Sequence, residues 1–322
     1  MRASPITLQD IYLARQRIAP HTRRTPLVYS SALSQGESQV YLKLETVQPT
    51  GSFKIRGAAN RLLQPDAAAG VVTVSTGNHG RAVAHMARRL GLRAVVCVPE
   101  QVLPHKVAAM RELGAQVVVH GQSQEEAEAH AADLAQAEGL TLVSPFDDPW
   151  VIAGQGTIGL ELLEELPQVD TAVIPLSGGG LLGGIALALK AANPAIRVVG
   201  VSMERGPVMV RSLEAGHPVQ LPEEPTLADS LMGGIGLENR YTFRLVQALM
   251  DEVVLLSEQE IADAMVHGLR AEHLVVEGGG AVAMGAVLHR KIARPGRHVA
   301  VVVSGGNVDP DLLSRLLTGD PR

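Results

Sequence analysis

The residue whose type and position point most directly to chemistry is Lys54, which lies in the segment 49–57. Ser52 belongs to the residue types that cap helices, so we expect a helix to begin near Phe53. Lys54 then lies in the first helical turn, where the helix dipole disfavours a cation. This placement predicts weakened protonation and a more nucleophilic amine. Phe53 fits an aromatic neighbour of a flat cofactor, although the stretch taken alone also fits an ordinary surface lysine.

Three other segments share one arrangement, in which an apolar run ends in a Ser-Gly turn and a helical pattern follows. Glycine lets the backbone approach a ligand closely, and a helix N-terminus favours an anion. Because such turns gather at the carboxyl edge of a sheet, the three together predict a ligand with a phosphate and other hydrogen-bond acceptors. One turn alone would also fit an ordinary connector. The segments are 74–80, 176–181 and 303–307.

A competing interpretation rests on Gly178, Gly180 and Gly183, whose spacing satisfies the dinucleotide fingerprint. Glu204 lies 21 residues beyond Gly183, where an acidic residue would meet a ribose hydroxyl. This motif favours an NAD-dependent oxidoreductase, but it leaves Lys54 without a role. A third possibility is a non-catalytic module that binds a small ligand at the sheet edge.

The elements that must position these residues are short apolar runs alternating with helical patterns. Nearly continuous apolar strands separated by helices indicate a parallel sheet covered on both faces. The expected fold class is therefore α/β, of the doubly wound kind. Strands are expected at 71–74, 93–98, 117–120, 171–176, 198–201 and 299–303, and helices at 81–90, 104–113 and 124–138.

Composition narrows the function classes. Of the 322 residues 46% are hydrophobic and 19% charged, which excludes disorder for most of the chain. A formal net charge of −5 gives no basic excess for nucleic acid. The single cysteine, Cys97, lies in an apolar run and is expected to be a buried strand residue. The N-terminus has no apolar leader, and Pro175 and three glycines interrupt the uncharged stretch 171–189, so we expect a cytoplasmic protein without a membrane span.

Taken together, these segments resemble the fold-type II pyridoxal-phosphate enzymes, in the threonine dehydratase and serine racemase family. The resemblance implies a tryptophan synthase β-like fold with two open, twisted, mostly parallel α/β domains and the cofactor between them. It implies a large cofactor-binding domain at 1–61 and 148–322, a small α/β domain at 62–147, and a homodimer. The segments that carry it are 43–45, 51–58, 75–80, 154–157, 177–181 and 304–307.

The resemblance also implies a role for each matching residue. Lys54 would form the Schiff base with pyridoxal 5'-phosphate and act as a catalytic residue, and Thr76 would be the second catalytic residue. Phe53 would pack beside the cofactor ring, Asn78 would hydrogen-bond its 3-oxygen, and Ser304 would meet its pyridine nitrogen. The phosphate would be held by Ser177, Gly178, Gly179, Gly180 and Leu181. The substrate carboxylate would be held by Ser75, Thr76, Gly77 and His79.

The implied activity is β-elimination from a 3-hydroxy amino acid such as threonine or serine, which gives a 2-keto acid and ammonia. Ser304, unlike an aspartate, cannot enforce a protonated pyridine, and this weaker electron sink suits elimination. Racemisation is an alternative, because Thr76 keeps a hydroxyl where serine racemases have a catalytic serine. Segments 144–149, 212–218 and 227–240 are similar to the hydroxyectoine-utilisation dehydratases, which adds a hydroxyectoine-derived intermediate to the candidate substrates.

Some positions fit the family pattern less well. The divalent-metal positions of the family fall on Ser202 and Val208, with Glu204 out of register, so no metal site is predicted. For Glu277 a place beside the cofactor ring and an ordinary structural place are equally open, and for His79 a structural hydrogen bond competes with a substrate contact.

Overall fold

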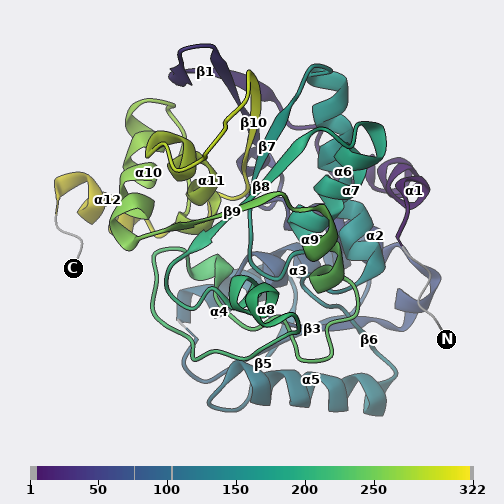
Figure 1. Ribbon diagram of the computed structural model, residues 1–322. Helices are drawn as coiled ribbons and strands as arrows, with labels where there is room; N and C mark the ends of the chain where they lie inside the picture. The colour runs from purple at the N-terminus through teal and green to yellow at the C-terminus, as the bar shows by residue number, and fades with distance from the viewer. Residues whose placement is uncertain (1–5, 76, 103, 320–322) are drawn as a thin grey trace.

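The computed structural model describes residues 6–75, 77–102 and 104–319, which form two β-sheets surrounded by helices (Figure 1). The strands are β1 (Leu27–Gln35), β2 (Ser38–Leu44), β3 (Val71–Val74), β4 (Ala94–Val98), β5 (Gln116–Val119), β6 (Thr141–Leu142), β7 (Thr171–Pro175), β8 (Arg197–Met203), β9 (Glu252–Leu256) and β10 (His298–Val303). The α-helices are α1 (Leu8–Ile18), α2 (Lys54–Leu62), α3 (Asn78–Leu90), α4 (Pro104–Glu112), α5 (Gln124–Glu138), α6 (Pro149–Glu165), α7 (Gly180–Ala192), α8 (Val208–Ala215), α9 (Thr242–Leu249), α10 (Glu258–Arg270), α11 (Gly278–Leu288) and α12 (Pro310–Thr318), and short 3₁₀ turns are η1 (Glu45–Val47), η2 (Pro65–Ala69) and η3 (Asp229–Leu231).

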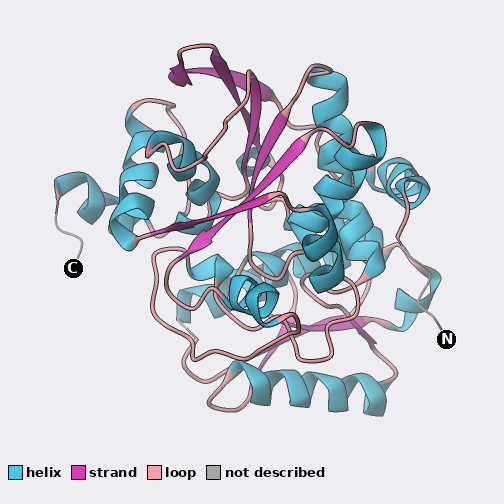
Figure 2. Cartoon of the chain, viewed as in Figure 1, coloured by secondary structure: helices cyan, strands magenta, loops and turns pink. Residues whose placement is uncertain are grey.

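The larger sheet has six strands in the order β1-β2-β10-β7-β8-β9, and the smaller has four in the order β5-β4-β3-β6. Neighbouring strands are parallel, apart from the antiparallel pair β1 and β2. Helices flank both sheets, and α5 runs beneath the smaller one in the view of Figure 2. These features confirm the predicted α/β class with two mostly parallel sheets.

The two central strands of the smaller sheet, β3 and β4, are buried, whereas the edge strands β5 and β6 are not. Every residue of β3 and β4 is buried, as their continuous apolar runs predict. Cys97 of β4 is fully buried and clusters with Ala127 and Ala131 of α5. Burial raises the pKa of its thiol to about 11, so the thiol stays protonated and unreactive. The expected strand position of this cysteine is confirmed.

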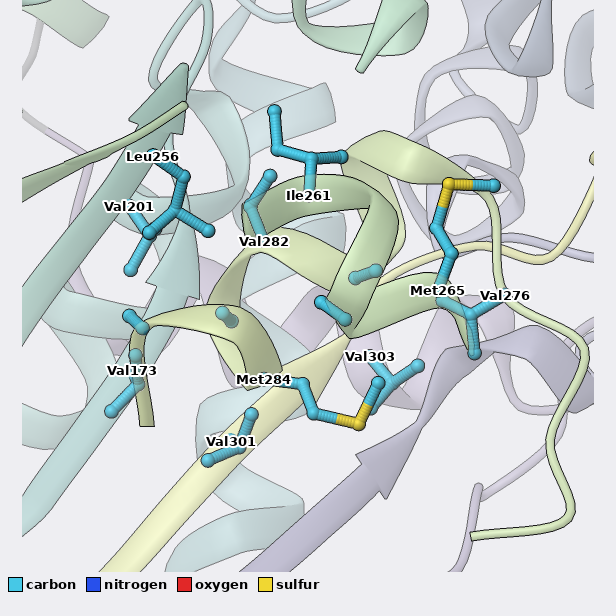
Figure 3. Close-up of a cluster of buried hydrophobic side chains, with 14 of the residues drawn as sticks. Val173, Val201, Leu256, Ile261, Met265, Val276, Val282, Met284, Val301 and Val303 are labelled. Carbon is cyan, nitrogen blue, oxygen red and sulfur yellow. The ribbon is translucent and has the colours of Figure 1, made fainter. Parts of the chain in front are cut away.

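The larger sheet has a core on each face, because successive strand residues point to opposite sides. Val301 and Val303 of β10 pack with Val282 and Met284 of α11 (Figure 3). Val302, between them, belongs to the opposite core, which α6 and α7 cover. With both faces covered, only the loops at the strand ends are free to build a site.

Helix α2 begins close to the expected residue, but its predicted cap is wrong. Ser52 does not cap this helix: its Oγ is buried without a hydrogen-bond partner among the described residues. The residue before the helix is Phe53, in helical conformation at φ −57° and ψ −22°. Ser52 instead forms an isolated antiparallel bridge with Gly305. This pairing holds Ser52 in the extended chain, so its side chain is not directed at the helix N–H groups.

The stretch 171–189 folds as β7 and the first turns of α7. Across the described ranges, no helix combines the length and apolarity needed to cross a membrane.

Candidate active site

The segment before Lys54 is attached to the turn that follows β10. In addition to the bridge between Ser52 and Gly305, the N–H of Phe53 donates to the carbonyl oxygen of Ser304 at 3.0 Å. The N–H of Gly306 donates to the carbonyl oxygen of Gly51 at 2.9 Å. The structure therefore brings together two segments that are 250 residues apart in the chain, both predicted to bind the cofactor.

Lys54 lies at the start of α2, partly buried, with its amine directed at the backbone. Its Nζ donates to the carbonyl oxygen of Pro145 at 2.9 Å and lies 5.2 Å from the centre of the Phe53 ring. Burial lowers the pKa of Lys54 to about 8, although the charge of Glu277 opposes this shift. A lysine of lowered pKa is a nucleophile and base near neutral pH. The direction agrees with the sequence prediction, but burial is the main cause.

The turn after β7 is built for close backbone approach. Gly179 has φ +86°, in the left-handed region that favours glycine. A Cβ on Gly178 would lie 2.4 Å from the ring carbons of Phe146, and one on Gly180 would lie 2.9 Å from the Phe146 carbonyl oxygen. The 13-residue helix α7 starts at Gly180 and leaves N–H groups free at its positive end. Such a helix N-terminus suits a phosphate group.

The other residues proposed for the phosphate turn are also present there. Leu181 is buried in the first turn of α7. The Ser177 hydroxyl donates to the carbonyl oxygen of Leu231 in η3 at 2.8 Å, so its side chain is directed at the neighbouring loop. A phosphate contact of Ser177 would therefore use its backbone N–H.

Three polar side chains from different segments form a hydrogen-bonded chain. Asn78 donates through Nδ2 to Glu277 Oε1 at 2.6 Å, and its Oδ1 accepts from Asn307 Nδ2 at 2.7 Å. Burial raises the pKa of Glu277 to about 7, and the charge of Asp229 adds to this effect. Glu277 therefore contacts Asn78, one of the residues predicted to hold the cofactor, and its place beside the ring stays a prediction.

The turn after β3 holds the residues proposed for the substrate carboxylate. The N–H of Gly77 donates to Ser75 Oγ at 3.2 Å. His79 is buried, and its Nε2 lies 3.3 Å from the carbonyl oxygen of Val143. Burial lowers the pKa of His79 to about 3, and the charge of Lys54 adds to the shift, so the imidazole is neutral. Thr76, the second predicted catalytic residue, lies outside the described residues.

Sequence reasoning missed the part played by the segment between β6 and α6. Pro145 supplies the carbonyl oxygen that Lys54 contacts, and Phe146 packs on the glycine turn. Asp147 accepts from the N–H groups of Arg240, Tyr241 and Thr242 at 2.7 to 2.9 Å, which fixes this segment to the start of α9. The run of Pro, Phe and two Asp residues was visible in the sequence, but its partners were not.

The metal positions of the family pattern stay occupied by non-ligating residues. Ser202 is buried in β8 and Val208 begins α8. Within the ranges that the structure describes, no group of three or more His, Cys, Asp or Glu side chains is arranged to hold a metal ion.

The residues around Lys54 fit pyridoxal phosphate. Buried polar atoms without a partner are rare in folded proteins. Yet Thr50 Oγ1, Ser52 Oγ and His79 Nδ1 have none among the described residues, which indicates that a polar ligand completes the site. An aldehyde needs the amine that Lys54 offers, and a phosphate needs the turn at Gly178. Combined with the two-sheet fold, these properties define a pyridoxal-phosphate enzyme.

Comparison with known proteins identifies the family. The chain belongs to the pyridoxal-phosphate dependent enzymes, whose family model matches residues 18–305. A Sinorhizobium fredii relative with a threonine dehydratase name is 48% identical over 320 residues, 98% of this chain and 96% of its own length. An L-threonine ammonia-lyase of Thermotoga maritima is 42% identical over 316 residues, 97% of this chain and 78% of its own. The structure of maize serine racemase has a TM-score of 0.91 at 34% identity, covering 98% of both chains.

The family assignment confirms the predicted cofactor and the fold-type II architecture. It also replaces the NAD interpretation of Gly178, Gly180 and Gly183. Gly183 lies inside α7, where a Cβ would lie 3.3 Å from Leu245 Cβ of α9, so close helix packing accounts for this glycine.

Proposed function

We propose that this protein is a pyridoxal-phosphate dependent ammonia-lyase that eliminates water from threonine or another 3-hydroxy amino acid and, when water hydrolyses the resulting enamine, releases ammonia and a 2-keto acid. The observation that carries the proposal is the Lys54 amine, whose pKa is lowered to about 8. Its partner Pro145 is followed by Phe146, which packs on the glycine turn at the N-terminus of α7. The names of the Sinorhizobium and Thermotoga relatives support threonine as the first substrate to test.

The side chains would divide the work as follows. Lys54 would hold the cofactor covalently, and the N–H groups of 177–181 would hold its phosphate, with Phe53 and Ser304 beside the ring. The cofactor, when bound, spreads the charge that develops at the substrate Cα. Once the substrate amine has replaced Lys54 on the cofactor, the freed Lys54 amine would take the Cα proton, because a buried amine of lowered pKa is a base near neutral pH.

The substrate carboxylate would be held at the start of α3. The residues proposed for it are Ser75, Thr76, Gly77 and His79. His79 is neutral, so it would contribute a hydrogen bond and no charge. The N–H groups at the start of a 13-residue helix supply the positive potential that a carboxylate needs.

Ammonia release from a panel of hydroxy amino acids tests the proposal. The wild-type protein is expected to bind the cofactor with a visible absorption band and to release ammonia and keto acid from threonine or serine. Lys54→Ala should abolish the band and the activity. Lys190→Ala is the matched control. Lys190 lies in the last turn of α7, at the opposite end from the glycine turn, and pairs with Asp251, so this variant should keep both the absorption band and the activity. A wild-type protein that takes up no cofactor would refute the assignment.

We also propose a hydroxyectoine-derived intermediate as a candidate substrate. Two of the three segments that carry this subfamily resemblance, 144–149 and 227–240, lie beside the proposed site: Asp147 accepts from the N–H of Arg240, and the carbonyl oxygen of Leu231 accepts from Ser177. Residues at these positions are suited to select between substrates. Higher kcat/KM for the pathway intermediate than for threonine and serine is the expected result, and the reverse order would reject it.

Racemisation is the second candidate activity, favoured by the likeness to maize serine racemase. Chiral chromatography of L-serine incubated with the enzyme separates the two activities. Formation of D-serine faster than pyruvate would favour the racemase.

We propose in addition the domain division 1–61 with 148–322 and 62–147, a homodimer, and a cytoplasmic location. All strands of the smaller sheet fall between residues 71 and 142, in support of the division. Exposed apolar side chains on α1 and β1, among them Tyr12 and Tyr29, are suited to an interface. Limited proteolysis tests the domain division, light scattering tests the homodimer, and cell fractionation tests the location.

A further inference from the structure

The proposed chemistry gives no role to Glu277, although its carboxylate is buried next to residues proposed for the cofactor. Glu277 precedes α11 and is 6% exposed, but its side chain makes no capping bond to that helix. Its Oε1 instead accepts from Asn78 Nδ2, at the start of α3, the helix that follows strand β3 of the smaller sheet. The contact therefore crosses from one sheet's layer of helices to the other, at the site.

The backbone makes room for this carboxylate. A Cβ on Gly305 would lie 2.1 Å from Glu277 Oε1, and one on Gly280 would lie 2.2 Å from the Gly305 carbonyl oxygen. No side chain larger than hydrogen fits at either position without moving its neighbours. The glycine at position 305, in the turn after β10, thus leaves room for the Glu277 carboxylate.

Asn307 fixes the orientation of the Asn78 amide from the other side. Its Nδ2 donates both to Asn78 Oδ1 at 2.7 Å and to the carbonyl oxygen of Thr50 at 2.9 Å. Two acceptors face this NH₂ group, so Asn307 cannot be reversed without losing both bonds. Asn78 must then direct its oxygen at Asn307 and its nitrogen at Glu277.

We propose that Glu277 is a positioning residue which, together with Asn307, holds the Asn78 amide with an N–H directed at the ring 3-oxygen of pyridoxal phosphate. An amide nitrogen carries two hydrogens, and Glu277 takes one of them. Among the described residues, Asn78 Nδ2 has no second acceptor. The inference rests on the proposed function, because it assumes that Asn78 contacts the cofactor.

A carboxylate suits this position better than an amide. Glu277 accepts hydrogen bonds from the side chain of Asn78 and from the backbone N–H of Asn307. Above its pKa of about 7 the Glu277 carboxyl is ionised and only accepts, whereas a glutamine carries a donor as well as an acceptor, so the comparison is made at pH 8 or higher. Glu277→Gln would therefore direct N–H groups at a donor in at least one of its orientations and disturb the Asn78 amide, despite its similar size.

Cofactor binding to the apo protein tests this inference without an activity assay. The dissociation constant of pyridoxal phosphate and the absorption band of the bound cofactor are measured for the wild type and for Glu277→Gln. We expect binding about tenfold weaker and a shifted band, as for the loss of a hydrogen bond to a charged group. Glu260→Gln is the control: Glu260 also lies at a helix start, in α10, where it pairs with Lys291.

A double variant separates positioning from a general loss of structure. If Glu277 acts through Asn78, Glu277→Gln should add little to the effect of Asn78→Ala on cofactor affinity. An unchanged affinity and band in Glu277→Gln, with a clear effect of Asn78→Ala, would overturn the role of Glu277 and leave the proposed function standing. Fully additive effects would also overturn it. A wild-type protein that binds no cofactor would overturn the proposed function itself.

Discussion

Lys54 and Arg56 are cations two residues apart on α2, but only Arg56 is paired with carboxylates among the described residues. Arg56 is 1% exposed and makes paired hydrogen bonds to Glu45 on one side and to Glu161 on the other, at 2.6 to 2.9 Å. Burial alone would lower the pKa of Arg56, but the two carboxylates raise it above its ordinary value. The arginine is a permanent, neutralised charge.

Among the described residues, Lys54 has no such partner. There its amine contacts only a carbonyl oxygen at hydrogen-bond distance, and burial lowers its pKa to about 8. The cation that is fully paired holds the helix in place, and the cation that is not paired is left reactive. A buried charge is expensive unless it is compensated, so the paired Arg56 stays charged while the unpaired Lys54 gives up its proton more readily than a free lysine.

The largest effect is expected from removing the paired cation. Arg56→Met leaves Glu45 and Glu161 buried without their main partner, which should lower the free energy of unfolding by about 3–5 kcal/mol. Chemical denaturation of the apo protein measures this. Arg211→Met, which breaks an exposed pair with Glu214, is the control and should change little. Equal stability of Arg56→Met and wild type would remove the contrast.

Removing the unpaired cation, Lys54, should raise the free energy of unfolding instead of lowering it. The folded protein holds Lys54 at a pKa of about 8, below its ordinary value of 10.5, so the charged form opposes folding below pH 8. Lys54→Met should therefore stabilise the apo protein at pH 7 by roughly 1–2 kcal/mol, less than the full shift implies because the side chain is partly exposed. As the pH rises from 8 to 10.5, the wild type gains stability and the difference should shrink. Denaturation curves at pH 7, 9 and 10.5 measure this, and a constant difference would contradict it.

A smaller effect is expected at the loop that provides the partner of Lys54. Asp147 accepts three N–H groups at the start of α9, so Asp147→Ala should cost about 1–2 kcal/mol, in the range of a lost helix cap. Because Pro145 lies two residues away, ammonia release should also fall several-fold. Ser123→Ala, which removes the cap of α5, a helix that packs on the smaller sheet, is the control and should spare activity. A similar loss of activity in both variants would contradict the link.

The smallest effect is expected from an exposed pair. Lys106 of α4 and Asp229 of η3 lie 3.0 Å apart, with side chains 31% and 51% exposed. Lys106→Ala should change the free energy of unfolding by less than about 1 kcal/mol, and added salt should weaken even this effect. A loss as large as that of Arg56→Met, measured in the same denaturation assay, would show that exposure does not separate the two kinds of pair.

The fold could be predicted where burial leaves a simple pattern in the chain. β3 and β4 are buried throughout and read as continuous apolar runs, and the Ala-rich polar stretch of α5 was predicted with the correct bounds. β1 gave no such signal, because only Ser30 and Leu33 of its nine residues are buried and they do not alternate with period two. β9 is an apolar run that the same reasoning could have reached.

The site could be predicted only as separate segments. The motifs around Lys54, Gly178 and Ser304 were visible, and the structure brings them to one place. Contacts between segments were not visible, since Asn78 and Glu277 are 199 residues apart and no local pattern pairs them. For the same reason the assignment of Ser52 as a cap was wrong: its partner, Gly305, is distant in sequence and close in space.

The place of β10 in the larger sheet has a consequence for biosynthesis. β10 lies between β2 and β7, and it is the last strand to be translated. Until residue 303 has left the ribosome, no strand joins the pair β1-β2 to the group β7-β8-β9, and the turn that pairs with Ser52 does not exist. Lys54 is synthesised early, but the turn that holds its segment is synthesised only after β10, so we expect capture of the cofactor to follow the synthesis of β10.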